Sequence, residues 1–175
     1  MGSAPMFGGS VEPGSGMRRA RRWRVLLAHD ATASTCDVLL DAIEGALGNV
    51  DIYESSSVDD ARDALRTSRA DSEAPWPGEM MRPTFDLCMV CLDLPPAPLG
   101  GVRLAGELMR AGLPVVLVTR SLRWIPASAA ALRELPWVPP DASVLEVARA
   151  VGVAMAASLS AVGPEQDEAR QASGE

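Results

Sequence analysis

Four polar residues stand directly after apolar runs of the kind that form buried strands. His29 and Asp30 follow one run, Asp93 follows a second and Thr119 follows a third. Two carboxylates held close together form an acidic pocket that suits a hard divalent cation such as Mg²⁺. A hydroxyl beside them could contact a phosphoryl oxygen carried on one of the carboxylates. These residue types therefore predict a phosphoacceptor site, provided that the fold brings them together.

The elements that would position these residues alternate between short apolar strands and longer amphipathic helices. The expected strands cover residues 25–28, 50–54, 87–92, 114–118 and 135–138. The expected helices cover residues 36–47, 58–67, 101–110, 127–134 and 144–159. Repeated alternation of this kind predicts an α/β fold with a doubly wound, five-stranded parallel sheet. Sites in such sheets lie beyond the carboxyl ends of the strands, which is where the four polar residues stand.

The length of 175 residues predicts one folded domain with tails. Residues 1–22 are rich in Gly, Ser and Pro and then in Arg, which predicts a disordered, partly basic N-terminal tail. The domain is expected to span residues 23–161, with residues 70–83 inserted as a proline-containing surface loop. Residues 162–175 are expected to form an acidic, disordered C-terminal tail.

The charged residues exclude several functions. A net charge of −7 disfavours nucleic acid as a partner, and the arginine-rich N-terminal arm leaves DNA contact as a weaker alternative. All sixteen basic residues are arginine, which excludes a Schiff-base lysine and a P-loop. His29 is the single histidine, so zinc sites that need two histidines are excluded as well.

The three cysteines, Cys36, Cys88 and Cys91, are too few for a disulfide framework and indicate a reducing compartment. Cys88 and Cys91 match a C-x-x-C pattern, but residues three apart on a strand point to opposite faces. Buried packing is therefore expected of this pair. No apolar run is long enough for a membrane helix, so we expect a cytoplasmic protein without membrane insertion.

The order of these motifs resembles the response-regulator receiver domain of the chemotaxis-regulator type, a flavodoxin-like (βα)5 fold. The segment 85–93 is similar to the phosphoacceptor strand, and Gly101 to the glycine that opens the third helix. The segment 112–119 resembles the fourth strand with its switch hydroxyl. The resemblance implies that Asp93 is the phosphoacceptor, that Thr119 is the switch hydroxyl, and that Asp30 and Asp93 are weak metal ligands.

Three positions depart from the receiver pattern. His29 replaces the first of two acids, Val138 replaces the lysine that contacts the phosphoryl group, and Leu135 replaces the aromatic switch residue. These losses imply a degenerate receiver, or pseudo-receiver, that requires no cofactor and binds Mg²⁺ more weakly than usual. The predicted function is a stand-alone, non-enzymatic signalling module that acts by protein–protein interaction. The alternative is a phosphorylatable single-domain response regulator that accepts a phosphoryl group on Asp93 with Mg²⁺.

Two apolar surfaces are candidates for partner contact. Trp124 and Trp137 fall in the region that forms the usual partner surface of receivers, and tryptophan is enriched at binding hot spots; packing under a short helix is the other interpretation. The resemblance implies a regulatory protein partner, a histidine kinase or another signalling protein, and a homodimer is possible. The second candidate surface lies on the last helix. An apolar stripe of this helix is expected to face the sheet, and Leu145 and Val153 lie outside that stripe. The expected stripe consists of Val144, Val147, Ala148, Val151 and Met155.

Overall fold

The computed structural model describes residues 22–30, 36–70, 85–95 and 99–161. The strands are β1 (Trp23–Ala28), β2 (Val50–Ser55), β3 (Leu87–Cys91), β4 (Val115–Val118) and β5 (Trp137–Val138). The α-helices are α1 (Cys36–Leu47), α2 (Val58–Ala70), α3 (Gly100–Arg110) and α4 (Val144–Ala161). Two 3₁₀ segments, η1 (Leu122–Trp124) and η2 (Ala127–Glu134), lie between β4 and β5.

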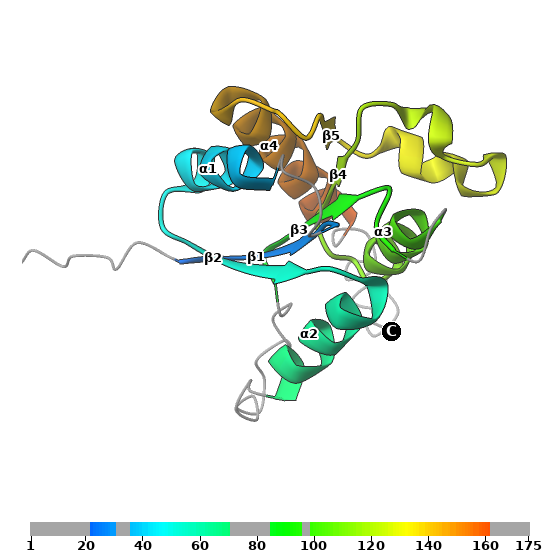
Figure 1. Ribbon diagram of the computed structural model, residues 1–175, viewed down its shortest axis with the longest axis horizontal. Helices are drawn as coiled ribbons and strands as arrows, with labels where there is room; N and C mark the ends of the chain where they lie inside the picture. Colours follow the sequence, from blue (N-terminus) through cyan, green and yellow to red (C-terminus); the bar gives the residue numbers. More distant parts are fainter. Residues whose placement is uncertain (1–21, 31–35, 71–84, 96–98, 162–175) are drawn as a thin grey trace, which may run out of the picture.

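The strands form one parallel sheet in the order β2-β1-β3-β4-β5. Helices α1 and α4 cover one face of the sheet, and α2 and α3 cover the other (Figure 1). The predicted fold class is therefore confirmed. The predicted tails and the loop at 70–83 lie almost wholly outside the described residues. No described helix is long and apolar enough to cross a membrane.

Alternating strand residues divide the core into two layers, because successive side chains of a strand point to opposite faces. Leu26, Cys88 and Leu117 belong to the layer beneath α2 and α3. Leu27 and Met89 belong to the layer beneath α1 and α4. Cys91 packs against this second layer, whereas Cys88 lies in the first. The prediction that the C-x-x-C pair packs on opposite faces is thus confirmed.

The segment after β4 differs from the expected helix at 127–134. It forms 3₁₀ turns, and Ala129 has non-helical angles of φ −117° and ψ 26° that interrupt them. Pro126 stands at the N-cap with extended angles, and the guanidinium of Arg133 donates a hydrogen bond of 2.6 Å to the Ile125 carbonyl oxygen. The non-helical residue Ala129 divides the segment into two short turns, and 3₁₀ bonding is common in runs of this length.

The predicted sheet-facing stripe of α4 is wrong at two positions. Val144 and Ala148 are exposed, whereas Ala150 and Ala154 are buried beside Val147 and Val151. The helix is apolar on most of its circumference, so its periodicity does not identify one buried face. Leu145 and Val153 are exposed, as expected.

Gly101 allows α3 to begin directly against the end of β3. A Cβ atom at this position would collide with the carbonyl oxygen of Cys91 and would lie 2.7 Å from the Leu92 Cα. The obstructing atoms belong to the backbone, so no side-chain rotation relieves the collision. The glycine therefore fixes α3 against the segment that carries Asp93.

Substituting Gly101→Ala is expected to lower the free energy of unfolding by roughly 1–3 kcal/mol or more, because α3 must move away from β3. Gly106→Ala, in the same helix, is the matched control because a Cβ there meets nothing within 4 Å. The control is expected to stabilise the protein by about 0.5–1 kcal/mol, since alanine is the better helix former. Urea unfolding measures both; equal stabilities for the two variants would contradict the close approach at Gly101.

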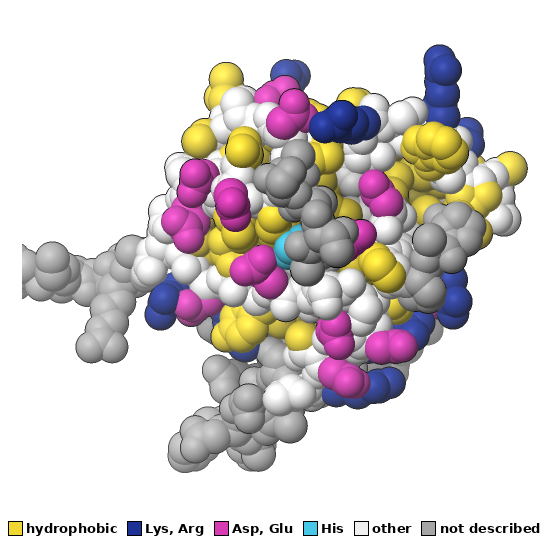
Figure 2. Space-filling view, in the orientation of Figure 1, with side chains coloured by type: hydrophobic (Ala, Val, Ile, Leu, Met, Phe, Trp, Pro, Cys, Tyr) yellow, Lys and Arg dark blue, Asp and Glu magenta, His cyan; other side chains and the backbone are white. Residues whose placement is uncertain are grey.

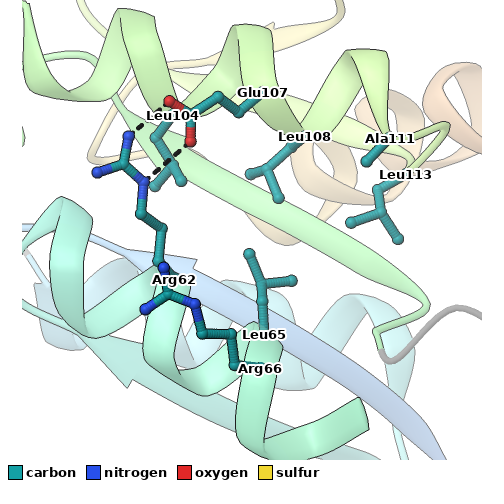
Figure 3. Close-up of a pocket in the computed structure, with 8 residues that line it drawn as sticks. All are labelled: Arg62, Leu65, Arg66, Leu104, Glu107, Leu108, Ala111 and Leu113. Atoms are coloured by element: carbon teal, nitrogen blue, oxygen red, sulfur yellow. Dashed lines mark hydrogen bonds and ion pairs between the residues drawn. The ribbon is translucent and has the colours of Figure 1, made fainter.

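An ion pair connects α2 to α3 on the same face of the sheet. Figure 3 shows Arg62 reaching from α2 toward Glu107 on α3, at a pocket of about 270 Å³ between the helices. Arg62 Nε donates a hydrogen bond of 3.0 Å to Glu107 Oε2, and a second guanidinium nitrogen contacts the other carboxylate oxygen. This hydrogen bonding holds the pKa of the Glu107 carboxyl below its usual range. Both side chains are about one-third exposed, so solvent screens much of the attraction.

The Glu107 pKa determines how the pair depends on pH. A carboxyl whose pKa is lowered in the folded state stabilises the protein above its ordinary pKa and loses that contribution as pH falls through the folded value. Glu107→Gln is therefore expected to cause a small loss of stability at neutral pH, which shrinks below about pH 4 and is gone once the pH lies below the lowered pKa of Glu107. Asp63→Asn, at the exposed pair with Arg66, serves as the control with no measurable effect. A pH-independent loss in urea unfolding would show that packing, and not charge, accounts for the effect.

Candidate functional site

The carboxyl ends of the inner strands meet at one edge of the sheet. Main-chain hydrogen bonds continue the parallel pairing past the strand ends, since the Leu92 N–H donates to Val118 O at 3.2 Å and the Thr119 N–H donates to Val138 O at 2.9 Å. On the other side, the His29 N–H donates to Ser55 O at 2.9 Å. The backbone therefore aligns the predicted site residues of four strands along this edge.

A pocket of about 560 Å³ opens beside the end of β3. Asp93 and Thr119 both line it, so the structure brings these two predicted residues together. Asp93 is exposed, whereas Thr119 is 4% exposed. The remaining lining residues are mainly apolar: Leu92, Leu99, Val102, Arg120, Trp124 and Pro140. The pocket thus combines one carboxylate and one guanidinium with an apolar wall.

The hydroxyl of Thr119 is engaged within its own turn. Its Oγ1 donates to the Ser121 carbonyl oxygen at 3.1 Å and accepts from the Ser121 N–H at 3.1 Å. Such a local side-chain turn uses the hydroxyl proton, which a bound phosphoryl oxygen would also need. The hydroxyl would have to leave this turn before it could contact a group on Asp93.

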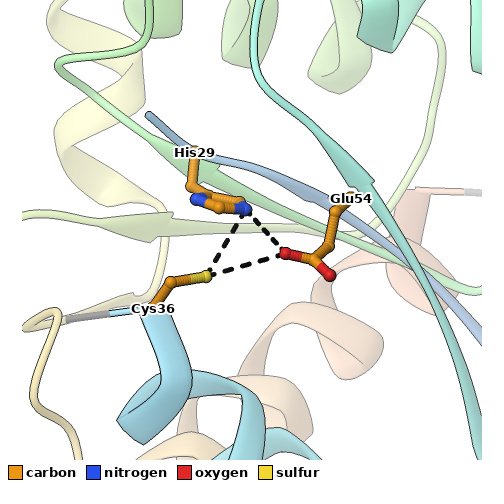
Figure 4. Close-up of side chains that lie close together, drawn as sticks. All are labelled: His29, Cys36 and Glu54. Carbon is orange, nitrogen blue, oxygen red and sulfur yellow. Dashed lines mark hydrogen bonds and ion pairs between the residues drawn. The ribbon is translucent and has the colours of Figure 1, made fainter. Parts of the chain in front are cut away.

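His29 lies at the same edge but outside the pocket lining. Its Nε2 is 2.9 Å from Glu54 Oε2, at the end of β2, and 3.4 Å from the Cys36 sulfur at the start of α1 (Figure 4). Burial and the neighbouring Glu54 and Asp37 raise the pKa of the Cys36 thiol to about 11. The sequence pattern predicted a place in the site for His29 but not for Glu54 or Cys36. It also did not predict Arg120 as a pocket residue.

Solved structures of receiver domains share this fold. The signal receiver domain of a modulated diguanylate cyclase from Desulfovibrio desulfuricans G20 aligns with a TM-score of 0.59 and 15% identity, over 81% of this chain and 99% of that one. The N-terminal domain of a response regulator/sensory box/GGDEF protein from Carboxydothermus hydrogenoformans aligns with a TM-score of 0.53 and 17% identity, over 79% and 98%. The chain has the receiver fold.

A response regulator receiver domain protein from Clostridium thermocellum is also similar, with a TM-score of 0.51 and 13% identity over 80% of this chain and 99% of that one. No family model matches the sequence, and no curated protein matches it significantly. The similarity is therefore one of fold, and the chemistry must be judged from the residues themselves.

Val138, to which the receiver resemblance assigns the lysine position, does not line the pocket. Val138 is 2% exposed and packs in the core layer beneath α1 and α4, with Val118, Ala142 and Val147. Leu135, to which the resemblance assigns the position of an aromatic switch residue, is partly buried against the other core layer. Trp124 and Trp137 are 77% and 44% exposed, so neither is packed under the 3₁₀ segments.

The donor set of this receiver fold fits Mg²⁺ poorly. Asp30 is half-buried and Asp93 is exposed, and the position of the usual first acid holds an imidazole, a poor ligand for a hard cation. Among the described residues, the side chains close enough to form a three-ligand group are His29, Cys36 and Glu54, and this group includes neither aspartate. Within the described part of the chain, Asp30 and Asp93 are thus not joined by a third ligand in a close three-residue group.

Proposed function

We propose that this protein is a pseudo-receiver: a receiver-fold signalling module that binds a regulatory protein without a phosphorylation switch. The observation that supports this most directly is the burial of Val138. A lysine or arginine at this strand end could attract a phosphoryl oxygen, whereas a valine held in the core supplies neither charge nor hydrogen-bond donor. The chain contains sixteen arginines, so the absence of a basic side chain at position 138 does not follow from a general lack of basic residues.

The engaged hydroxyl of Thr119 supports the same function. A phosphorylation switch needs a hydroxyl that moves toward the new phosphoryl group, and the Ser121 turn opposes that movement with two hydrogen bonds. Leu135 replaces an aromatic ring whose change of rotamer would carry the signal onward. The chain thus lacks three parts of the switch: a cation at Val138, a free hydroxyl at Thr119 and an aromatic ring at Leu135.

The surface next to the pocket suits a protein partner. Trp124 is largely exposed and lines the pocket beside Asp93 and Arg120, so one small area offers an aromatic ring and both signs of charge. Interfaces are enriched in tryptophan and arginine at the residues that contribute most to binding. A histidine kinase or another signalling protein is the class of partner that the receiver fold favours.

The second candidate function is that of a phosphorylatable response regulator. Asp93 is exposed at the end of β3 and shares its pocket with Thr119, and this juxtaposition favours phosphoryl transfer to Asp93 with Mg²⁺. The two functions differ in one measurable property, which is whether Asp93 accepts a phosphoryl group or its analogue.

Titration with beryllofluoride and Mg²⁺ tests this property, because beryllofluoride forms the analogue of an aspartyl phosphate. Trp124 lies in the same pocket as Asp93 and serves as an internal fluorescence reporter. For a pseudo-receiver, we expect no saturable change in tryptophan fluorescence up to millimolar ligand. Trp124→Phe identifies the contribution of this residue among the four tryptophans.

A saturable change that Asp93→Asn abolishes would reject the pseudo-receiver and support the phosphorylatable alternative. A saturable change that survives Asp93→Asn would indicate binding of the anion elsewhere, and acceptance by Asp93 would remain unsupported.

Partner binding through the tryptophans is the second expectation. Affinity capture from an extract of the source organism, followed by quantitative mass spectrometry, should recover a signalling protein. The double substitution Trp124→Ala/Trp137→Ala is expected to reduce the recovery of this protein by about tenfold or more, as truncation of a hot spot does. Asp93→Asn is expected to leave the recovery unchanged, because the proposed contact does not require phosphorylation.

The matched control removes exposed apolar side chains from another surface. Leu145 and Val153 of α4 are exposed to a similar degree, and Leu145→Ala/Val153→Ala is expected to retain the partner. Loss of the partner only with the α4 variant would place the interface on α4, and loss with Asp93→Asn would favour the phosphorylatable function. Circular dichroism on each variant verifies that the fold is retained.

A further inference from the structure

Three side chains with different ligand atoms converge beside the receiver pocket. His29 leaves the end of β1, Glu54 lies at the end of β2 and Cys36 is the first residue of α1 (Figure 4). The distances are 2.9 Å from His29 Nε2 to Glu54 Oε2, 3.4 Å from the Cys36 sulfur to His29 Nε2, and 3.9 Å from this sulfur to Glu54 Oε2. The parallel register of β1 and β2 fixes two of the three ligands, because it pairs Leu27 with Glu54 and Ala28 with Ser55.

Without a metal, the imidazole Nε2–H and the Cys36 thiol can both donate to Glu54 Oε2, so hydrogen bonding already holds the three side chains together. Nε2 of an imidazole carries either one proton or one lone pair, yet it faces both the thiol and the carboxylate. The histidine side chain is 10% exposed, and its Nδ1 is buried with no hydrogen-bond partner among the described residues. Glu54 and Cys36 are therefore the polar side chains that orient this buried ring. A single ion at the point where the three atoms converge would contact all of them at once.

The spacing of the ligand atoms is close to that of a tetrahedral zinc site. With bonds of about 2.1 Å from zinc to nitrogen or oxygen and about 2.3 Å to sulfur, tetrahedral geometry places the ligand atoms about 3.4–3.6 Å apart. The separations of 2.9, 3.4 and 3.9 Å differ from these values by about half an ångström or less. Small side-chain rotations suffice to admit the ion.

The charges of the cluster also suit a divalent cation. A thiolate and a carboxylate together neutralise a charge of +2, and imidazole contributes a neutral ligand. Figure 2 shows acidic side chains gathered around the small exposed area of the histidine. Glu54 and Asp37 both act electrostatically on the Cys36 sulfur. A cation bound at this position offsets the repulsion between these carboxylates and the thiolate that forms on binding.

We propose that His29, Cys36 and Glu54 form a binding site for a transition-metal ion, Zn²⁺ in particular. Sulfur and imidazole nitrogen select a borderline ion and disfavour Mg²⁺, which requires oxygen ligands. The Glu54 side chain is 52% exposed, so water or a ligand from a partner can reach the ion as its fourth ligand. Binding displaces the thiol proton to solvent as the Zn–S bond forms.

This site is separate from the aspartate pocket and is independent of the proposed function. Its ligands join the ends of β1 and β2 to the start of α1, and Asp93 and Thr119 take no part in it. Metal binding would fix the beginning of α1 against the sheet next to Asp30. The replacement of the usual acid by His29 then changes the metal preference of this edge from Mg²⁺ to a softer ion.

Cobalt provides a direct test because Co²⁺ substitutes for Zn²⁺ and reports its ligands by absorption. The full chain, stripped with a chelator and reduced, is titrated with Co²⁺. We expect one equivalent to bind, with a thiolate-to-cobalt charge-transfer band in the near ultraviolet and tetrahedral d–d bands in the visible. Addition of Zn²⁺ is expected to remove these bands, whereas excess Mg²⁺ leaves them in place.

Variants identify the ligands. Cys36→Ser is expected to abolish the charge-transfer band, and His29→Gln and Glu54→Gln to weaken Co²⁺ binding tenfold or more. Cys91→Ser is the matched control because Cys91 is another partly buried cysteine outside the cluster, and it is expected to bind like the unchanged protein. Glu54 is half-exposed, so its conservative substitution keeps the test valid even if His29→Gln misfolds.

The unchanged protein also gives a test that needs no variant, which is a saturable rise in melting temperature on addition of Zn²⁺. Absence of the charge-transfer band in the unchanged protein would overturn the proposal. So would a band that persists in Cys36→Ser, or one that disappears in Cys91→Ser but not in Cys36→Ser.

Discussion

The parallel pairing of the inner strands is the constraint on which the remaining structure depends. Hydrogen bonds from Leu92 to Val118 and from Thr119 to Val138 fix how far each strand extends before its chain turns toward a helix. A shift of one residue would turn every side chain of a strand to the other face and exchange core for surface. The same register that buries Val138 therefore places Asp93 and Thr119 in one pocket, and it sets Glu54 beside His29 at the other end of the edge.

The sequence predicts the strands and most helices because apolar runs and helical spacing are local properties. Local spacing does not predict the 3₁₀ turns of η2 or their interruption at Ala129. It also fails on α4, where Val144 packs over Gly45 of α1 and remains partly exposed. His29 was identified as a departure from the pattern, but Glu54 and Cys36 become its neighbours only through strand register and the starting point of a helix.

The replacements at the sheet edge form a consistent set under the proposed functions. The receiver resemblance predicts an acid at position 29 and a cation at position 138, where the chain has His29 and Val138. The first change suits a softer metal ion, and the second removes attraction for a phosphoryl group. Both positions take part in main-chain pairing at the sheet edge, His29 with Ser55 and Val138 with Thr119.

The turn that encloses the Thr119 hydroxyl has a consequence for how information passes through such a module. A switched receiver reports the fraction of its molecules that carry a modification. A binding face held in one conformation has no such variable, so the fraction of partner bound follows from the amount of protein and its affinity alone. Under the proposed function, control of the signal then belongs to synthesis and degradation of the protein, and the response can be no faster than its turnover.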